Sequence, residues 1–195
     1  MTRPPGTRGR KRSTAAENAV LAAAYELLAK EGLQATTVEA IAQRAKVSKA
    51  TIYKWWPNRA AVIMSAFLRE ARDALPYPEQ LDMQSVFDRL HHMAQEFHGP
   101  IGNMIRVLIA EGQSDPEIAQ AFRDGYVMAR REQGVEIVRA AIKAGVIGDA
   151  DPDVILDMLY APLYYRLLVG HQPLTAAFIR EHVKLALNGL VPRPA

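Results

Sequence analysis

The stretch TTVEAIAQRAKVSKATIYKWWPNR, residues 36–59, contains the strongest structural signal in this chain. Its first half predicts a short amphipathic helix, because apolar side chains recur at the spacing of one helical face, at Val38, Ile41, Ala42 and Ala45. Thr36 is followed three residues later by Glu39, which is the pattern of a capping box. We therefore expect this helix to begin at Thr36 or Thr37.

The second half of the stretch predicts another short helix after a tight turn. Ser48 is a favourable N-cap for a helix over residues 49–55, and Pro57 disfavours its continuation. Ile52 and Trp56 share the inner face at i, i+4 spacing. The outer surface carries Lys49, Thr51, Tyr53 and Lys54. A helix with an apolar back and a basic, hydroxyl-rich front suits the major groove of DNA, so the stretch predicts a helix-turn-helix.

The composition indicates a soluble, cytoplasmic protein with a substantial core. Of the 195 residues, 49% are hydrophobic, and the chain contains no cysteine, which excludes disulfides and thiolate-bound metals. The arginine-rich N-terminus lacks the apolar segment of a signal peptide, and no apolar run approaches the length of about 18 residues that a membrane helix needs. We therefore expect no membrane partner. A glycine-rich phosphate loop is also absent, so we expect no cofactor.

The charge is distributed unevenly along the chain, although its formal total is only +3. Residues 1–60 carry 11 lysines and arginines against 4 acidic residues, whereas residues 61–195 carry 13 against 17. A basic head on an acidic body indicates a polyanionic partner at one end, and the basic part coincides with the helix-turn-helix. At the start of this basic part, residues 1–13 have no apolar periodicity and are expected to form a disordered basic arm.

The rest of the chain also predicts helices, and no stretch shows the sustained alternation of a strand. Gly32 is a suitable C-cap for a first helix over residues 14–30, which should brace the two short helices. Prolines, glycines and N-caps then delimit helices over residues 60–75, 83–98, 102–114, 116–144, 152–169 and 174–188. We expect an all-α fold of about nine helices.

The helix-turn-helix resembles a known family. The sequence TTVEAIAQRAKVSKATIYKWWPNRAAVI, residues 36–63, is similar to the N-terminal domain of TetR/AcrR-type transcriptional regulators, above all in the pattern IAxxAxVSxxTIYxxWPxR followed by an apolar helix. The resemblance implies a DNA-binding domain over residues 14–60 and a ligand-binding and dimerisation domain over residues 61–195. The helix over residues 60–75 would link the two.

The resemblance also implies which residues contact DNA. The positions that match the family's contacts are Thr37, Lys49, Ala50, Thr51, Tyr53, Lys54, Trp55 and Arg59. Ala50 stands where many members have glycine, and Arg59 stands where they usually have lysine. Trp55 stands where they often have tyrosine or histidine, and it can still donate one indole N–H.

The last two expected helices are more apolar than one small core requires. Their apolar residues are Val154, Ile155, Met158, Leu159, Leu163, Leu167, Leu168, Phe178, Val183, Leu185 and Leu187. Two copies of the chain would bury the surplus in a four-helix seam, and the family resemblance implies the same homodimer. Two recognition helices roughly 34–36 Å apart would then read a palindromic operator in double-stranded DNA.

Aromatic and methionine side chains of the body are candidates for a small-molecule site. An apolar pocket with a few polar groups is a common form of such a site, although side chains of this kind more often form core. The candidates are Phe67, Met93, Phe97, Met104, Leu108, Phe122, Tyr126 and Met158, with His92, Arg106, Glu111 and Gln113 as candidate polar contacts.

We therefore expect a regulator that is not an enzyme: a repressor that a small hydrophobic ligand releases from its operator. Two alternatives stay open. A densely packed body would favour an architectural or effector-independent DNA binder. Asp88, His91 and His92 would favour a metal-dependent helical hydrolase, because Asp88 and His92 share a helix face at i, i+4 spacing. The chain offers no nucleophile and no second pair of ligands for that chemistry, so we expect no metal site.

Overall fold

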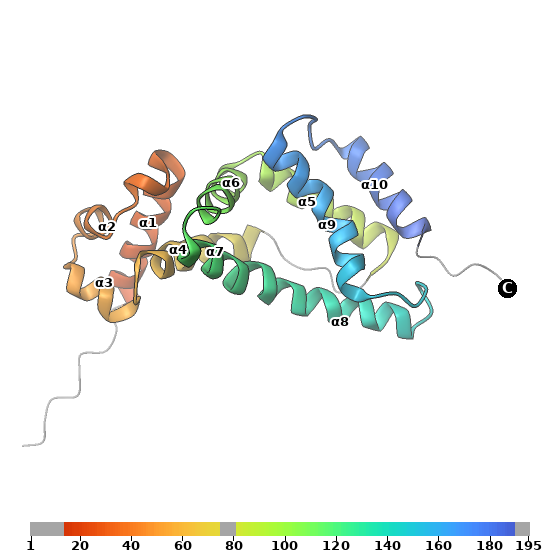
Figure 1. The fold of residues 1–195 in the computed structure, drawn as a ribbon, viewed down its shortest axis with the longest axis horizontal. Coiled ribbons are helices and arrows are strands. Elements are labelled where there is room, and N and C mark those ends of the chain that lie inside the picture. The colour runs from red at the N-terminus through yellow and green to blue at the C-terminus, as the bar shows by residue number, and fades with distance from the viewer. Residues whose placement is uncertain (1–13, 75–80, 190–195) are drawn as a thin grey trace, which may run out of the picture. The chain divides into compact units, whose positions relative to one another are not determined.

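The computed structural model describes residues 14–74 and 81–189, and every regular element in these two stretches is helical (Figure 1). The elements are α1 (Thr14–Ala35), α2 (Val38–Ala45), α3 (Lys49–Trp55), α4 (Arg59–Ala74), α5 (Met83–Phe97), α6 (Pro100–Gly112), α7 (Pro116–Phe122), the π-helix η1 (Arg123–Met128), α8 (Ala129–Lys143), α9 (Pro152–Val169) and α10 (Ala176–Asn188). The prediction of an all-α fold is confirmed. The basic arm predicted over residues 1–13 lies outside the described residues.

The described residues form two compact units, of which the first ends at Ile63 and the second begins at Met64. The boundary therefore falls inside α4. In the first unit α1 packs against α2, and α2 packs against α3. The inner face predicted for the first helix is buried, at Val20, Leu21, Ala24, Leu27 and Leu28. It gives the two short helices the apolar surface that they need, because helices of seven or eight residues bury too little by themselves.

The first helix differs from its prediction at its C-terminal end. It was expected to end near Lys30, but helical structure resumes after Gly32 and continues to Ala35. Gly32 has φ 80° and ψ 177°, a conformation that is essentially restricted to glycine. The glycine therefore interrupts the helix, as its sequence context indicates, and a further turn follows it.

The second unit is a bundle in which α10 lies alongside α5 and α8 packs against α9 (Figure 1). α6 contacts α5, α7 and α9. The fully buried side chains at its centre include Phe67, Leu90, Met93, Phe97, Met104, Ile105 and Leu108. α6 begins at Pro100 and comes very close to the end of α5, because Gly102 has no side chain that would collide with the backbone of Phe97.

Aspartate–proline pairs begin two helices of this unit, as their sequence predicts. Asp115 accepts hydrogen bonds from the N–H groups of Glu117 and Ile118 at the start of α7. Asp151 accepts from the N–H of Asp153 at the start of α9. A proline at the first helical position loses no hydrogen bond, because the first N–H groups of a helix have no intrahelical partner.

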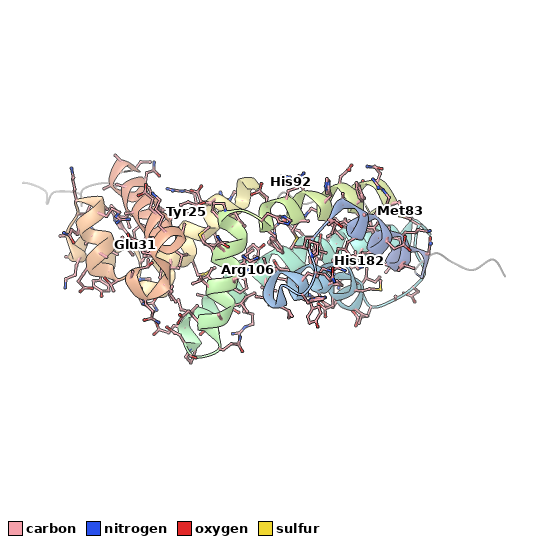
Figure 2. The ribbon with its side chains drawn as sticks, turned by 90° about the horizontal axis from the view of Figure 1, so that it is seen from above. Tyr25, Glu31, Met83, His92, Arg106 and His182 are labelled. Atoms are coloured by element: carbon pink, nitrogen blue, oxygen red, sulfur yellow. The ribbon has the colours of Figure 1, made fainter. Side chains whose placement is uncertain are left out.

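Two polar side chains tie neighbouring helices to α9 (Figure 2). Arg106 of α6 donates through Nε to the carbonyl oxygen of Leu167 at 2.9 Å. His182 of α10 forms a hydrogen bond of 2.9 Å through Nε2 with the carbonyl oxygen of Leu159.

Within the described stretches, no helix is both long and apolar enough to span a membrane.

Candidate functional site

The two short helices of the first unit form a helix-turn-helix whose turn is fixed by local hydrogen bonds. Lys46 ends α2 in the left-handed conformation, with φ 54°. Ser48 then caps α3, because its Oγ accepts a hydrogen bond of 3.1 Å from the N–H of Thr51. The start of α3 at Lys49 is therefore the one that the sequence predicts.

The capping box predicted for the first of these helices is wrong. Thr37, and not Thr36, is the N-cap of α2, and its Oγ1 accepts a hydrogen bond of 3.1 Å from the N–H of Ala40. Thr36 is fully buried, and its hydroxyl donates to the carbonyl oxygen of Gly32 at 2.7 Å. Either threonine is a suitable N-cap residue, and burial of Thr36 decides between them. Glu39 lies exposed in the first turn of α2.

The second of these short helices, α3, has one buried and one exposed side. Ile52 and Trp56 are buried, as predicted. Lys49 and Tyr53 lie one helical turn apart on the exposed side, where Tyr53 is 52% exposed. Ala50 and Lys54 are also exposed. This arrangement presents a short basic surface to solvent while the apolar side holds the helix in place.

The remaining predicted DNA contacts are half-buried and already take part in the first unit's own structure. Thr51 forms a hydroxyl–hydroxyl hydrogen bond of 2.9 Å with Ser48. Trp55 packs edge-on against Trp56, with ring centroids 5.6 Å apart. Arg59 opens α4, and its Nη1 lies 3.5 Å from the carbonyl oxygen of Leu33. Thr37 is the cap of α2 described above.

Comparison with protein families gives a match for the N-terminal part and another for the C-terminal part of the chain. Residues 20–65 match the family model described as bacterial regulatory proteins, tetR family. Residues 83–186 match the model described as tetracyclin repressor-like, C-terminal domain. The chain belongs to the TetR family. It is therefore a helix-turn-helix transcriptional regulator.

Relatives of this TetR-family protein match it over nearly its whole length. The uncharacterized HTH-type transcriptional regulator YdeS of Bacillus subtilis is 39% identical over 185 residues, which are 94% of this chain and 93% of that protein. The DNA-binding transcriptional repressor TetR of Mycobacteroides abscessus is 29% identical over 94% of this chain and 96% of its own. The crystal structure of the TetR family transcription regulator SCO0332 superposes with a TM-score of 0.76 at 33% identity, covering 91% of this chain and 99% of that one.

The second unit of this TetR-family chain contains a cavity of about 310 Å³, which we call the α8–α9 cavity. Its wall consists of Arg89, Met93, Ile109, Phe122, Tyr126, Val127, Arg130, Arg131, Leu156, Asp157, Tyr160, Ala161 and Tyr164. The residues come from α5, α6, α7, η1, α8 and α9. The volume lies at the lower end of the roughly 300–1,000 Å³ typical of small-molecule sites.

Three of the eight predicted ligand contacts, Met93, Phe122 and Tyr126, line this cavity. Phe67 and Phe97 lie behind its wall. The ring of Phe67 is 5.0 Å from that of Tyr126, and the ring of Phe97 is 5.3 Å from that of Tyr164. Met104 and Leu108 are fully buried and do not line the cavity. Met158 is 36% exposed on α9 and does not line it either.

The polar part of the wall has no signal in the sequence that would select it. Arg89 looks like a surface residue of an amphipathic helix, yet it is only 7% exposed. Tyr126 and Val127 belong to η1, whose wider turn changes which residues face the cavity, and π-helical segments often occur at functional sites. A shift of register of this kind cannot be read from the apolar spacing of residues 116–144.

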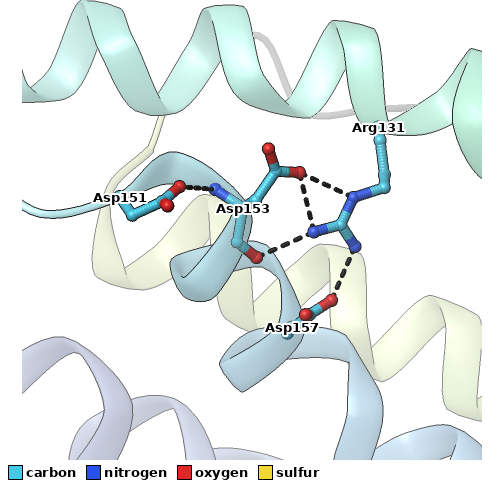
Figure 3. A network of polar contacts seen from close by, with 4 residues as sticks. All are labelled: Arg131, Asp151, Asp153 and Asp157. Atoms are coloured by element: carbon cyan, nitrogen blue, oxygen red, sulfur yellow. Dashed lines mark hydrogen bonds and ion pairs between the residues drawn. The ribbon is translucent and has the colours of Figure 1, made fainter.

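An ion-pair cluster joins α8 to α9 at the wall of the cavity (Figure 3). Arg131 donates through Nε to Asp153 Oδ1 at 2.8 Å and through Nη1 to Asp157 Oδ1 at 2.6 Å. A third hydrogen bond of 2.8 Å runs from its Nη2 to the carbonyl oxygen of Asp153. One arginine thereby connects two successive turns of α9 to α8.

His91 and Asp88, two residues of the alternative metal site, each contact a neighbour on α5. His91 stacks on Phe87, with ring centroids 5.4 Å apart. Asp88 accepts a hydrogen bond of 2.8 Å from Gln84. In the part of the chain that the structure describes, no group of three or more histidine, aspartate or glutamate side chains is placed to hold a metal ion.

Proposed function

We propose that this chain is a homodimeric repressor that binds a palindromic operator through α3 and leaves it when a small molecule occupies the α8–α9 cavity. The exposed basic side of α3 carries the proposal of DNA contact, with Lys49, Ala50, Tyr53 and Lys54 as its centre. The M. abscessus relative is named as a repressor, which supports the same direction of regulation here. Because chromosomal DNA is the proposed partner, the cytoplasm is the proposed place of action.

The cavity favours a ligand-responsive regulator over an effector-independent DNA binder. A body that served only for dimerisation has no need of a partly open pocket of about 310 Å³ with several charged groups in its wall. We place the effector there, against Met93, Phe122 and Tyr126.

We propose that α4 carries the signal. Phe67 of α4 contacts both Phe122 and Tyr126, with ring centroids 6.1 Å and 5.0 Å apart, and these two rings line the cavity. A ligand that moves them would move α4, whose first residues belong to the helix-turn-helix unit. The ligand must bind more tightly to the conformation that does not fit DNA, and coupling of about 1–3 kcal/mol would change operator affinity roughly 5- to 150-fold.

DNA binding is tested by selecting duplexes from a random library with the full chain and measuring affinity by fluorescence anisotropy. Lys49→Ala and Tyr53→Ala should each weaken binding about tenfold, because each removes a contact at the groove. Lys49→Ala should also lower the slope of log affinity against log salt by about one, as the loss of one phosphate contact predicts.

Lys143→Ala is the matched control, since it removes an exposed lysine from the last turn of α8 in the second unit. Its operator affinity should equal that of the wild type, and all variants should keep the wild-type mass in size-exclusion chromatography with light scattering. Wild-type affinity in both Lys49→Ala and Tyr53→Ala would show that α3 is not the DNA-reading surface.

A further inference from the structure

The wall of the α8–α9 cavity carries an excess of positive charge. It contains three guanidinium groups, those of Arg89, Arg130 and Arg131, against the one carboxylate of Asp157. Arg131 is held by Asp153 and Asp157 in the cluster described above. Arg89 and Arg130 are the two cations of the wall that lie outside this cluster.

A pair of phenol groups, those of Tyr126 and Tyr164, shares this wall with Arg89 and Arg130. The guanidinium carbon of Arg130 lies 5.5 Å from the ring centroid of Tyr126. Tyr164 donates from its hydroxyl to the hydroxyl of Tyr126 over 3.4 Å. Desolvation raises the pKa of Tyr164 well above its usual value, and Tyr126 adds to the rise, whereas Arg130 and Arg89 act in the opposite direction. Tyr164 therefore stays neutral, and its hydroxyl donates to Tyr126.

The polar part of the wall thus offers mainly donors. Arginine has no acceptor, and its planar guanidinium group matches the two oxygens of a carboxylate. A ligand with a negatively charged, acceptor-rich end complements these groups, whereas a cation or a donor-rich ligand does not.

The remaining wall is apolar and partly aromatic. Met93, Ile109, Phe122, Val127, Leu156 and Ala161 contribute its aliphatic and aromatic surface. Together with a volume of about 310 Å³, this surface fits a compact apolar or aromatic body and is too small for a long chain or a large polycyclic skeleton.

We propose that the effector is a small organic carboxylate with a compact apolar or aromatic body, and that its carboxylate group binds between Arg89 and Arg130. This assignment rests on the proposed function in that it takes the α8–α9 cavity as the effector site. It goes further by naming the chemical class of the effector and the two residues that would select it.

Calorimetry on the full chain tests the charge requirement with matched pairs of probes. The acids are benzoate, phenylacetate and cinnamate, and each is compared with its primary amide, which has nearly the same shape but no charge. At least one acid should bind about tenfold or more tightly than its amide, since hydrogen bonds to charged groups contribute about 1.5–3 kcal/mol. Binding of none of the acids, or equal binding of acids and amides, would overturn the proposal.

Substitutions of the two arginines test whether they cause the preference for an acid over its amide. Arg130→Met keeps the aliphatic stem of a half-buried residue and should abolish the preference for the acid. Arg89→Met should do the same, and because Arg89 is buried its fold is checked by circular dichroism. Arg139→Met is the control, as Arg139 lies on the same helix α8, is exposed and pairs with Glu136. An unchanged preference in Arg130→Met would refute the placement even if Arg89→Met does not fold.

Titration of the selected operator duplex in the same samples separates this proposal from the proposed function. A protein that binds the duplex and ignores all three acids contradicts the carboxylate assignment alone. A protein that binds no duplex yet prefers acids to amides contradicts the regulatory function alone, and the cavity assignment stands.

Discussion

Lys49, at the start of α3, forms an ion pair with an acidic neighbour in the absence of DNA. Its Nζ lies 2.8 Å from Oε1 of Glu39 on α2, and both side chains are largely exposed. The hydrogen bond from Lys49 lowers the pKa of Glu39, and the same bond raises the pKa of Lys49. A phosphate group at the proposed DNA surface would have to compete with this carboxylate for Lys49, so we expect Glu39 to reduce the affinity for DNA.

Glu39→Gln should therefore increase operator affinity. The substitution removes one negative charge beside the proposed DNA surface, and at this separation in a largely aqueous environment we expect a gain of about threefold. Fluorescence anisotropy with the selected duplex measures it, and the gain should shrink as salt is added because exposed charges are screened.

The comparison for this variant is Glu136→Gln, which breaks an equally exposed pair with Arg139 on α8. That change alters the net charge by the same amount and should leave operator affinity unchanged. A decrease in affinity in Glu39→Gln would mean that Glu39 positions Lys49 for binding and does not compete with DNA.

At the scale of single elements, side-chain caps define where helices begin. Asp82 caps α5, where one carboxylate oxygen accepts from the N–H of Ser85 at 2.8 Å and the other accepts from its hydroxyl at 2.7 Å. These hydrogen bonds, the backbone bond first, lower the pKa of Asp82 below its ordinary value. A carboxylate with a lowered folded-state pKa stabilises the fold above its unfolded pKa and loses that contribution as the pH falls through the folded value.

Asp82→Ala should destabilise the second unit by about 0.5–2 kcal/mol at pH 7, the usual effect of losing an N-cap. The difference from the wild type should shrink as the pH falls below the ordinary pKa of aspartate, about 4. Urea unfolding followed by circular dichroism at a series of pH values measures both effects. Asp149→Ala, an exposed position outside any helix, should cause neither.

The break in α1 provides a second prediction at this scale. Gly32→Ala should lower the free energy of unfolding of the first unit by about 1–3 kcal/mol, because alanine is strained at φ 80°. The effect must come from the backbone, since a methyl group added at this glycine would meet no atom within 4 Å. Both tryptophans, Trp55 and Trp56, belong to the first unit, so tryptophan fluorescence during urea unfolding reports on this unit alone.

Gly189→Ala is the matched control for this backbone effect. Gly189 has φ −72°, which alanine adopts readily, and an added methyl would make only ordinary contacts. Because Gly189 lies in the second unit, which tryptophan fluorescence does not report, the unfolding of this variant is followed by circular dichroism. Equal loss of stability in both variants would show that the conformation of Gly32 is not the cause.

At the scale of the whole molecule, the described part of the chain leaves an apolar stripe on one side of α9 exposed. Val154, Met158, Tyr165 and Leu168 recur at i, i+4, i+11 and i+14 and are all exposed. The opposite side of the same helix is buried in the second unit, at Ile155, Leu156, Leu159, Leu163 and Leu167. An amphipathic helix has no need of two apolar sides in a monomer, so this stripe supports the proposed dimer seam.

Leu168→Glu should dissociate this dimer. Burying a carboxylate in place of a leucine removes apolar contact and adds a desolvation cost, and in a symmetric seam the change acts twice, so the dimer dissociation constant should rise at least about a hundredfold. Light scattering at micromolar concentration should then give a mass near 21.6 kDa in place of twice that value. Operator affinity should fall at the same time.

Val146→Glu tests whether any exposed apolar residue would have this effect. Val146 is 49% exposed in the turn after α8 and lies outside α9 and α10. It should leave both mass and operator affinity unchanged. A Leu168→Glu protein that keeps the mass of a dimer would place the seam on another surface.

The sequence by itself determined the helical elements and the helix-turn-helix, because these depend on residues close together in the chain. Ser48, Asp115 and Asp151 act as the caps that their sequence context predicts, and Ile52 and Trp56 form the predicted buried side of α3. A helix start depends on hydrogen bonds within about four residues, so local pattern is sufficient to find it.

Only the tertiary structure decided between Thr36 and Thr37 as the cap of α2, since burial against other helices fixes that choice. It alone brought Arg89, Arg130 and Tyr164 to one cavity from helices far apart in the chain. The π-helical turn of η1 has no signature in the spacing of apolar residues, and it alters which side chains face that cavity. The elements follow from neighbours in sequence, whereas the chemistry of the cavity follows from neighbours in space.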